Sequence, residues 1–237
     1  MLNLYKKERI QEDDLVIEDD FEVIPYSSVS LFINNPNFNE TFLNQMTHNL
    51  WENFALEMFK SAMLSLLISK KINVIYFVDK KSIFFNQFVY DTEGFKIYTT
   101  KKTVVDQDDL LEDAILSAIQ KVNFPDYENF RSVVYDIINQ YIGKKVMNKP
   151  EKKFILEYLK DYSNKNLWFK LKSNKKWWGL KYEIEIDEDK KAELTKSVQN
   201  IKSKFSEFNR KDLILRKFLA YIESVVARDF SSRTPSD

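Results

Sequence analysis

The stretch from Trp51 to Val78 constrains this chain most, because it has the pattern of a core helix followed directly by a strand. Its first part is too densely apolar for a surface helix and is typical of a helix buried on most sides. Residues 69–71 end that helix with two cations, which the helix dipole favours at a carboxyl end. The β-branched and aromatic run 72–78 then predicts a strand.

Lys60 interrupts the apolar helix nine residues after Trp51. In one interpretation it extends to solvent with its stem lying on apolar surface. In the other, Trp51 and Lys60 form half of an anion site, about 14 Å apart along the axis at a rise of about 1.5 Å per residue. The two would lie closer if Trp51 sat in a preceding loop.

Composition excludes several classes of function. Lys+Arg and Asp+Glu both number 36, and the net charge of +0 argues against a dedicated nucleic-acid binder. The absence of Cys excludes disulfides and thiolate metal sites. Three glycines cannot build a glycine-rich phosphate loop, and His48 is the one histidine. We therefore predict no catalytic residue, no metal, no cofactor and no enzymatic activity.

The order of elements predicts a mainly α fold. We expect a single globular domain of helices around a buried central helix, with short strands and a protruding β-hairpin. Residues 1–20 are predicted to be a flexible acidic segment, as a loose tail or a short edge strand. Residues 21–230 would form the domain and 231–237 a tail. No signal peptide and no membrane span are expected.

Periodicity and turn residues place the elements. Helices are expected at 41–69 (two helices meeting near Trp51), 106–122, 126–141, 150–162, 187–208 and 210–230. Strand-like stretches are expected at 21–33, 72–78, 83–90 and 95–100, with Asp91–Gly94 as a tight turn between the last two.

Residues 167–186 have the alternation of a β-hairpin. Its expected tip carries Trp177, Trp178 and Leu180 beside Lys172, Lys175 and Lys176. These aromatic residues could fold back onto the domain or form an oligomer contact. Alternatively they insert into a bilayer, where tryptophan favours the head-group level and each nearby lysine adds about 1 kcal/mol on an anionic surface.

A basic segment at 144–153 precedes and begins the helix that starts near Pro150. It contains Lys144, Lys145, Lys149, Lys152 and Lys153. One interpretation is a solvated basic face. The other is a phosphate site made of helix-start amides and lysines.

The order of these motifs resembles the Golgi phosphoprotein 3 family of peripheral membrane adaptors. The similar parts are the Trp51–Lys60 spacing with its small-residue and leucine run, the segment 110–130, the hairpin 167–186 and the helix 210–230. Together they span roughly 50–230. The family has arginines where this chain has lysines, which keep the charge and lose bidentate phosphate recognition.

The resemblance implies a protein that binds a phosphoinositide head group on a membrane surface, the cytosolic face of the Golgi in a eukaryote. It implies a head-group pocket of Trp51, Lys60, Lys149 and Lys152, and membrane insertion by Trp177, Trp178 and Leu180. It also implies retention of membrane proteins by their cytoplasmic tails, and oligomer contacts through the hairpin. A divergent or prokaryotic relative would fit the differences.

Other functions remain open at this stage. A soluble protein-binding module, such as an inhibitor or immunity protein, would use the acidic segment 12–20 or the aromatic hairpin tip. A winged-helix nucleic-acid binder would use the hairpin as its wing, although the zero net charge counts against it.

Overall fold

The computed structural model describes residues 5–15, 40–83, 88–100, 110–121, 127–165, 168–176, 179–193, 195, 196, 199 and 213–235. The elements with defined bounds are β1 (Tyr5–Leu15), α2 (Glu40–Gln45), α3 (His48–Ile68), β2 (Ile72–Ile83), β3 (Phe88–Thr99), α4 (Leu110–Lys121), α5 (Tyr127–Ile142), α6 (Pro150–Lys165), β4 (Phe169–Lys176), β5 (Gly179–Ile186) and α8 (Leu213–Ser231).

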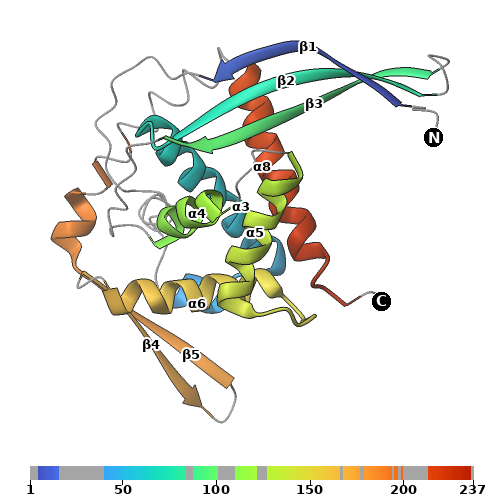
Figure 1. The fold of residues 1–237 in the computed structure, drawn as a ribbon. Helices are drawn as coiled ribbons and strands as arrows, with labels where there is room; N and C mark the ends of the chain where they lie inside the picture. Colours follow the sequence, from blue (N-terminus) through green and yellow to red (C-terminus); the bar gives the residue numbers. More distant parts are fainter. Residues whose placement is uncertain are drawn as a thin grey trace.

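The fold is mixed α/β, so the prediction of a mainly α fold is wrong. Among the described residues, β1, β2 and β3 form a three-stranded antiparallel sheet, and β4 and β5 form a two-stranded one. Figure 1 shows the larger sheet at one end of the helices. The β4–β5 hairpin protrudes from the opposite end, beyond α6.

The strand β1 is longer and more firmly paired than its polar sequence predicts. Residues 5–15 form an edge strand that pairs with β2 on both sides of a register shift between Arg9 and Gln11, so the edge-strand interpretation, rather than the loose tail, holds for them. Arg9 makes an ion pair with the buried carboxylate of Asp79, and its guanidinium lies 4.3 Å from the ring centre of Phe77. Leu15 is buried at the end of the strand. These long-range contacts hold a segment whose own hydrophobicity is low.

Gly94 explains why the predicted turn at residues 91–94 is also wrong. These residues lie inside β3, and Gly94 pairs with Phe77 of β2. A Cβ on Gly94 would come 2.5 Å from Cζ of Phe77. The glycine therefore makes room for a cross-strand aromatic ring, which is a recognised role of glycine within strands. The chain reverses instead between Ile83 and Phe88, which pair with each other.

The helix α3 is the buried centre that the sequence predicts. It packs against α8, α6, α4 and β2. The ring of Phe59 in α3 stacks on the ring of Phe154 in α6, with 5.6 Å between ring centres. The expected pair of helices in this region is confirmed as α2 and α3, and the break at residues 46–47 places Trp51 inside α3.

Local sequence signals correctly predict where several other helices begin or end. Gly143 follows α5 with a φ of +71°, a left-handed conformation that glycine adopts without strain. Pro150 begins α6, where its missing N–H and fixed φ are suited to a first helical position. The described helix α8 lies close to its expected bounds.

The C-terminal segment after α8 is not a loose tail over its described part. The side chain of Arg233 is 4% exposed and pairs with Asp229 at 2.6 Å. It also donates hydrogen bonds to Asn139 Oδ1 at 2.8 Å and to the carbonyl oxygen of Gly143 at 2.7 Å. Arg233 therefore joins the end of α8 to the end of α5.

Some expectations concern residues outside the described ranges. They include the strand-like stretch 21–33, the middle of the strand expected at 83–90, the helix start at 106–109, most of the helix expected at 187–208 and the first residues of the helix expected at 210–230.

Replacing Arg233 tests the buried ion pair. We expect Arg233→Met to lower the free energy of unfolding by about 3–5 kcal/mol, because Asp229 stays buried without its cation. Urea denaturation measures this change. The double variant Arg233→Met/Asp229→Leu is expected to recover most of the loss. A single variant as stable as the wild type would contradict the role of the pair.

Candidate functional site

The first turns of α3 and α6 meet and bring two cation-bearing contacts together. Nζ of Lys152 lies 5.6 Å from the ring centre of Trp51. One turn away, Nδ1 of His48 lies 3.9 Å from Oε2 of Glu151. We call Trp51, Lys149 and Lys152 the α6 cation cluster. Its three members are among the four residues expected in the head-group pocket.

Trp51 forms the floor of this cluster. Its side chain is 1% exposed, so its position is set by the core around α3. The ammonium group of Lys152 faces the ring at a distance typical of a cation–π contact. Such a contact positions the lysine head without neutralising its charge, which remains available to an anion.

Lys149 and Lys152 reinforce each other's positive charge. Lys149 is exposed with a φ of +57°, in the turn just before Pro150. The pKa of Lys152 is lowered, first by burial and second by the charge of Lys149. A bound anion would counteract this lowering of the pKa, because it stabilises the protonated form of the lysine.

Within the part of the chain that the structure describes, the basic segment 144–153 lacks ion-pair partners for its lysines. In the described part of the chain, none of its five lysines lies within 4.0 Å of a carboxylate. They are Lys144, Lys145, Lys149, Lys152 and Lys153. Surface lysines elsewhere, such as Lys172 and Lys217, do have glutamate partners. The segment is therefore a local excess of positive charge on a chain of net charge +0.

Glu151 limits the part that backbone amides can play. Its carboxylate is buried, and burial is the largest cause of its raised pKa. A hydrogen bond with its own backbone N–H and the charge of His48 lower this pKa, whereas Glu52 raises it. Pro150 has no N–H to offer. Since the N–H of Glu151 bonds its own side chain, the lysines are the stronger candidates for contacting an anion, and the expected phosphate site of helix-start amides and lysines stays a prediction.

The structure does not bring Lys60 to this cluster. Trp51 and Lys60 both lie within α3, and nine residues make about 2.5 turns, or roughly 180° around the axis. Lys60 instead pairs with Glu57 and lies 3.5 Å from Glu223 of α8. The two halves of the expected pocket thus lie on opposite faces of one helix.

The hairpin tip is only partly within the described residues. Trp177 and Trp178 lie outside them, and β4 and β5 reach Lys176 and Gly179 on either side. Leu180 is in β5, where its backbone pairs with Lys175. The hairpin is confirmed, with strands longer than the sequence indicated.

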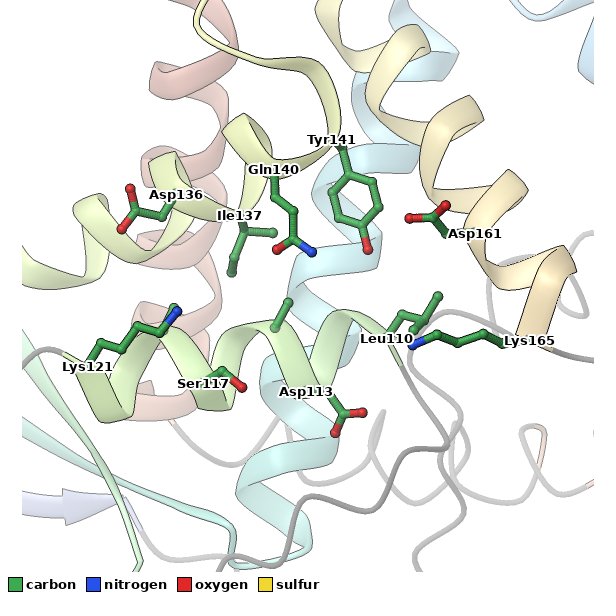
Figure 2. Close-up of a pocket in the computed structure, with 12 residues that line it drawn as sticks. Leu110, Asp113, Ser117, Lys121, Asp136, Ile137, Gln140, Tyr141, Asp161 and Lys165 are labelled. Atoms are coloured by element: carbon green, nitrogen blue, oxygen red, sulfur yellow. The ribbon is translucent and has the colours of Figure 1, made fainter.

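A second candidate is a cleft of about 510 Å³ between α4, α5 and the end of α6, which sequence reasoning missed. Its lining comprises Leu110, Asp113, Ala114, Ser117, Ala118, Lys121, Asp136, Ile137, Gln140, Tyr141, Asp161 and Lys165. Small residues of α4 leave the space, and Figure 2 shows the hydroxyl of Tyr141 and the amide of Gln140 directed toward it. No local sequence motif marks such a cleft, because it arises from helix packing.

The charges around the cleft do not select one kind of ligand. Lys121 and Asp136 lie toward one end, and Asp161 and Lys165 toward the other (Figure 2). Both signs of charge occur at each end, so neither an anion nor a cation is clearly favoured. The α6 cation cluster, with one sign of charge, is the stronger candidate.

Two other kinds of site find no support in the described ranges. No group of three or more His, Cys, Asp or Glu side chains there could hold a metal ion. No helix there is both long enough and apolar enough to cross a bilayer.

Comparisons with known proteins add no relatives. No protein-family model matches the sequence, and no curated protein or solved structure matches the chain.

The buried carboxylate of Glu151 gives a pH-dependent prediction. Its pKa is raised above the ordinary value of 4.5, so the native state binds the proton more tightly than the unfolded state. This contribution to stability is present below the unfolded pKa and is lost as the pH rises through the folded pKa. We therefore expect Glu151→Gln to raise the melting temperature at neutral pH.

The same comparison across pH contains its own control. The advantage of Glu151→Gln is expected to shrink as the pH falls below about 4.5, where the wild-type carboxyl is protonated in both states. Glu157→Gln, a change at a half-buried position on the same helix, is expected to have little effect. Thermal unfolding of the wild type, Glu151→Gln and Glu157→Gln over a pH series measures these effects. A Glu151→Gln protein that is less stable than the wild type at neutral pH would contradict the prediction.

Proposed function

We propose that this chain is a non-enzymatic peripheral membrane protein that binds the head group of an anionic, phosphoinositide-like phospholipid. The observation that carries the proposal is the α6 cation cluster, where Lys152 lies over Trp51 beside Lys149 and no carboxylate of the described ranges lies within 4.0 Å of either lysine. Phosphate groups carry the complementary charge. Lysine ammonium groups bind phosphate as point charges, which suits a pocket without arginine.

The arrangement of the fold supports a membrane-facing end. Both α6 and the β4–β5 hairpin lie at the end of the molecule opposite the larger sheet (Figure 1). In this proposal the α6 cation cluster binds the head group. Trp177, Trp178 and Leu180 at the hairpin tip enter the bilayer, as the resemblance to the Golgi phosphoprotein 3 family implies. An adaptor role toward cytoplasmic tails stays a prediction from that resemblance.

The first test removes the two lysines of the cluster. We expect Lys149→Gln/Lys152→Gln to weaken binding to vesicles that carry phosphatidylinositol 4-phosphate by roughly 30-fold. This figure takes about 1 kcal/mol for each cation near an anionic surface. Co-sedimentation over a series of lipid concentrations measures it, and rising salt should weaken wild-type binding.

Lys60→Gln is the matched control for this experiment. It removes one charge of the same kind on the far face of α3, so we expect binding within about twofold of the wild type. Equal loss in the control and the double variant would show that only total charge matters. Wild-type binding to neutral vesicles as strong as to anionic ones would end the proposal.

The hairpin tip is tested separately. Trp177→Ala/Trp178→Ala is expected to weaken vesicle binding several-fold, because two interfacial anchors are lost. Its affinity for soluble inositol phosphates should be unchanged, because the head-group site lies on α3 and α6. Isothermal titration with the soluble head group and co-sedimentation with vesicles separate the two effects. Unchanged vesicle binding would place these tryptophans away from the membrane.

A further inference from the structure

The loop between α5 and α6 exposes an apolar side chain among its lysines. Val146 is 60% exposed, the highest value among the large apolar residues that the described ranges leave exposed. Lys144 and Lys145 precede it directly, and Lys149 follows three residues later. An isolated exposed valine needs no explanation. A valine flanked by lysines that have no carboxylate partner among the described residues has the composition of an interfacial membrane contact.

The loop is held in place from both ends. Arg233 donates to the carbonyl oxygen of Gly143 at 2.7 Å, and the backbone N–H of Met147 donates to the carbonyl oxygen of Arg233 at 2.8 Å. Arg233 itself is fixed by its buried pair with Asp229. The backbone on both sides of Val146 is therefore anchored to Arg233 by hydrogen bonds. Little conformational entropy remains to be lost when this loop meets a surface.

We propose that the loop 143–149 is a membrane-contact loop, in which Val146 enters the head-group layer of an anionic bilayer and the flanking lysines contact its phosphates. This inference rests on the proposed function and names the lipid-contacting surface beside the head-group site. Val146 gains from leaving water, and the lysines gain from the negative surface potential.

A bilayer fits this loop better than a dissolved anion does. Inorganic phosphate or a free head group would engage the lysines and leave Val146 in water. Only a surface that offers anionic groups and an apolar layer close together satisfies both kinds of side chain. The basic segment supplies the charge complementarity to that surface, since its lysines lack acidic partners in the described part of the chain.

The absence of cysteine allows a direct measurement. Val146→Cys carries a single attachment point for an environment-sensitive nitrobenzoxadiazole label. On vesicles of phosphatidylcholine with phosphatidylinositol 4-phosphate, we expect a blue shift and at least a twofold rise in emission, with quenching by spin-labelled lipid. Lys80→Cys is the matched control, exposed on β2 in the larger sheet, and its label is expected to stay in water.

A second variant tests the energetic role of the side chain. Val146→Asn keeps a similar size and exposes a polar group. We expect at least about a threefold loss of affinity for the same vesicles, because burial of the two methyl groups is lost. Affinity for soluble inositol 1,4-bisphosphate is expected to be unchanged.

The outcomes separate this inference from the proposed function. If the labelled protein co-sediments with vesicles but its emission matches that in buffer, the loop does not enter the bilayer and the head-group proposal survives. If heparin without lipid produces the same emission change, the loop responds to any polyanion rather than to a bilayer, and the inference is overturned. If the wild type does not co-sediment with anionic vesicles, both proposals fail.

Discussion

The burial of α3 is the constraint on which the rest of the structure depends. A helix that is apolar on most of its surface must be covered on several sides, and here α4, α6, α8 and β2 supply that cover. No two-layer arrangement of one sheet and one helix could do so. The coverage fixes where polar side chains of α3 can emerge. Polar side chains of the first turn of α3 contact the start of α6, and Lys60 contacts Glu223 of α8.

The candidate site inherits its rigidity from this core. Trp51 is immobilised by burial, and α6 is aligned on the same helix by the stacked pair Phe59 and Phe154. Lys152 is therefore presented from one rigid element over another, as a preorganised binding site requires. Close to these lysines, burial raises the pKa of the Glu151 carboxylate, so its ionisation at this site costs more than in water.

Sequence reasoning succeeded where the determining forces are local. The helix ends near Gly143 and Pro150 follow from backbone conformation, and the buried helix α3 follows from its dense apolar pattern. It failed where distant residues decide the structure, as with Arg9 on Asp79 and Gly94 beneath Phe77. The resemblance implied that Trp51 and Lys152 lie together, and the structure shows that contact, whereas Lys60 lies on the opposite face of α3 because nine residues turn the helix by about 180° beyond two full turns. The cleft of α4 and α5 has no local signal.

The register of β1 has a consequence for how the chain reaches its native state. Tyr5 pairs with Ile83 and Leu15 with Val74, whereas Ile83 and Phe88 join β2 to β3 as neighbours. The entropy of loop closure therefore favours the local hairpin before the first strand can dock. During synthesis β1 leaves the ribosome before β2, the strand with which it pairs, has been made. Until β1 docks, one edge of β2 exposes unpaired backbone groups to other chains. The charged side chains of β1 help to keep the undocked strand soluble.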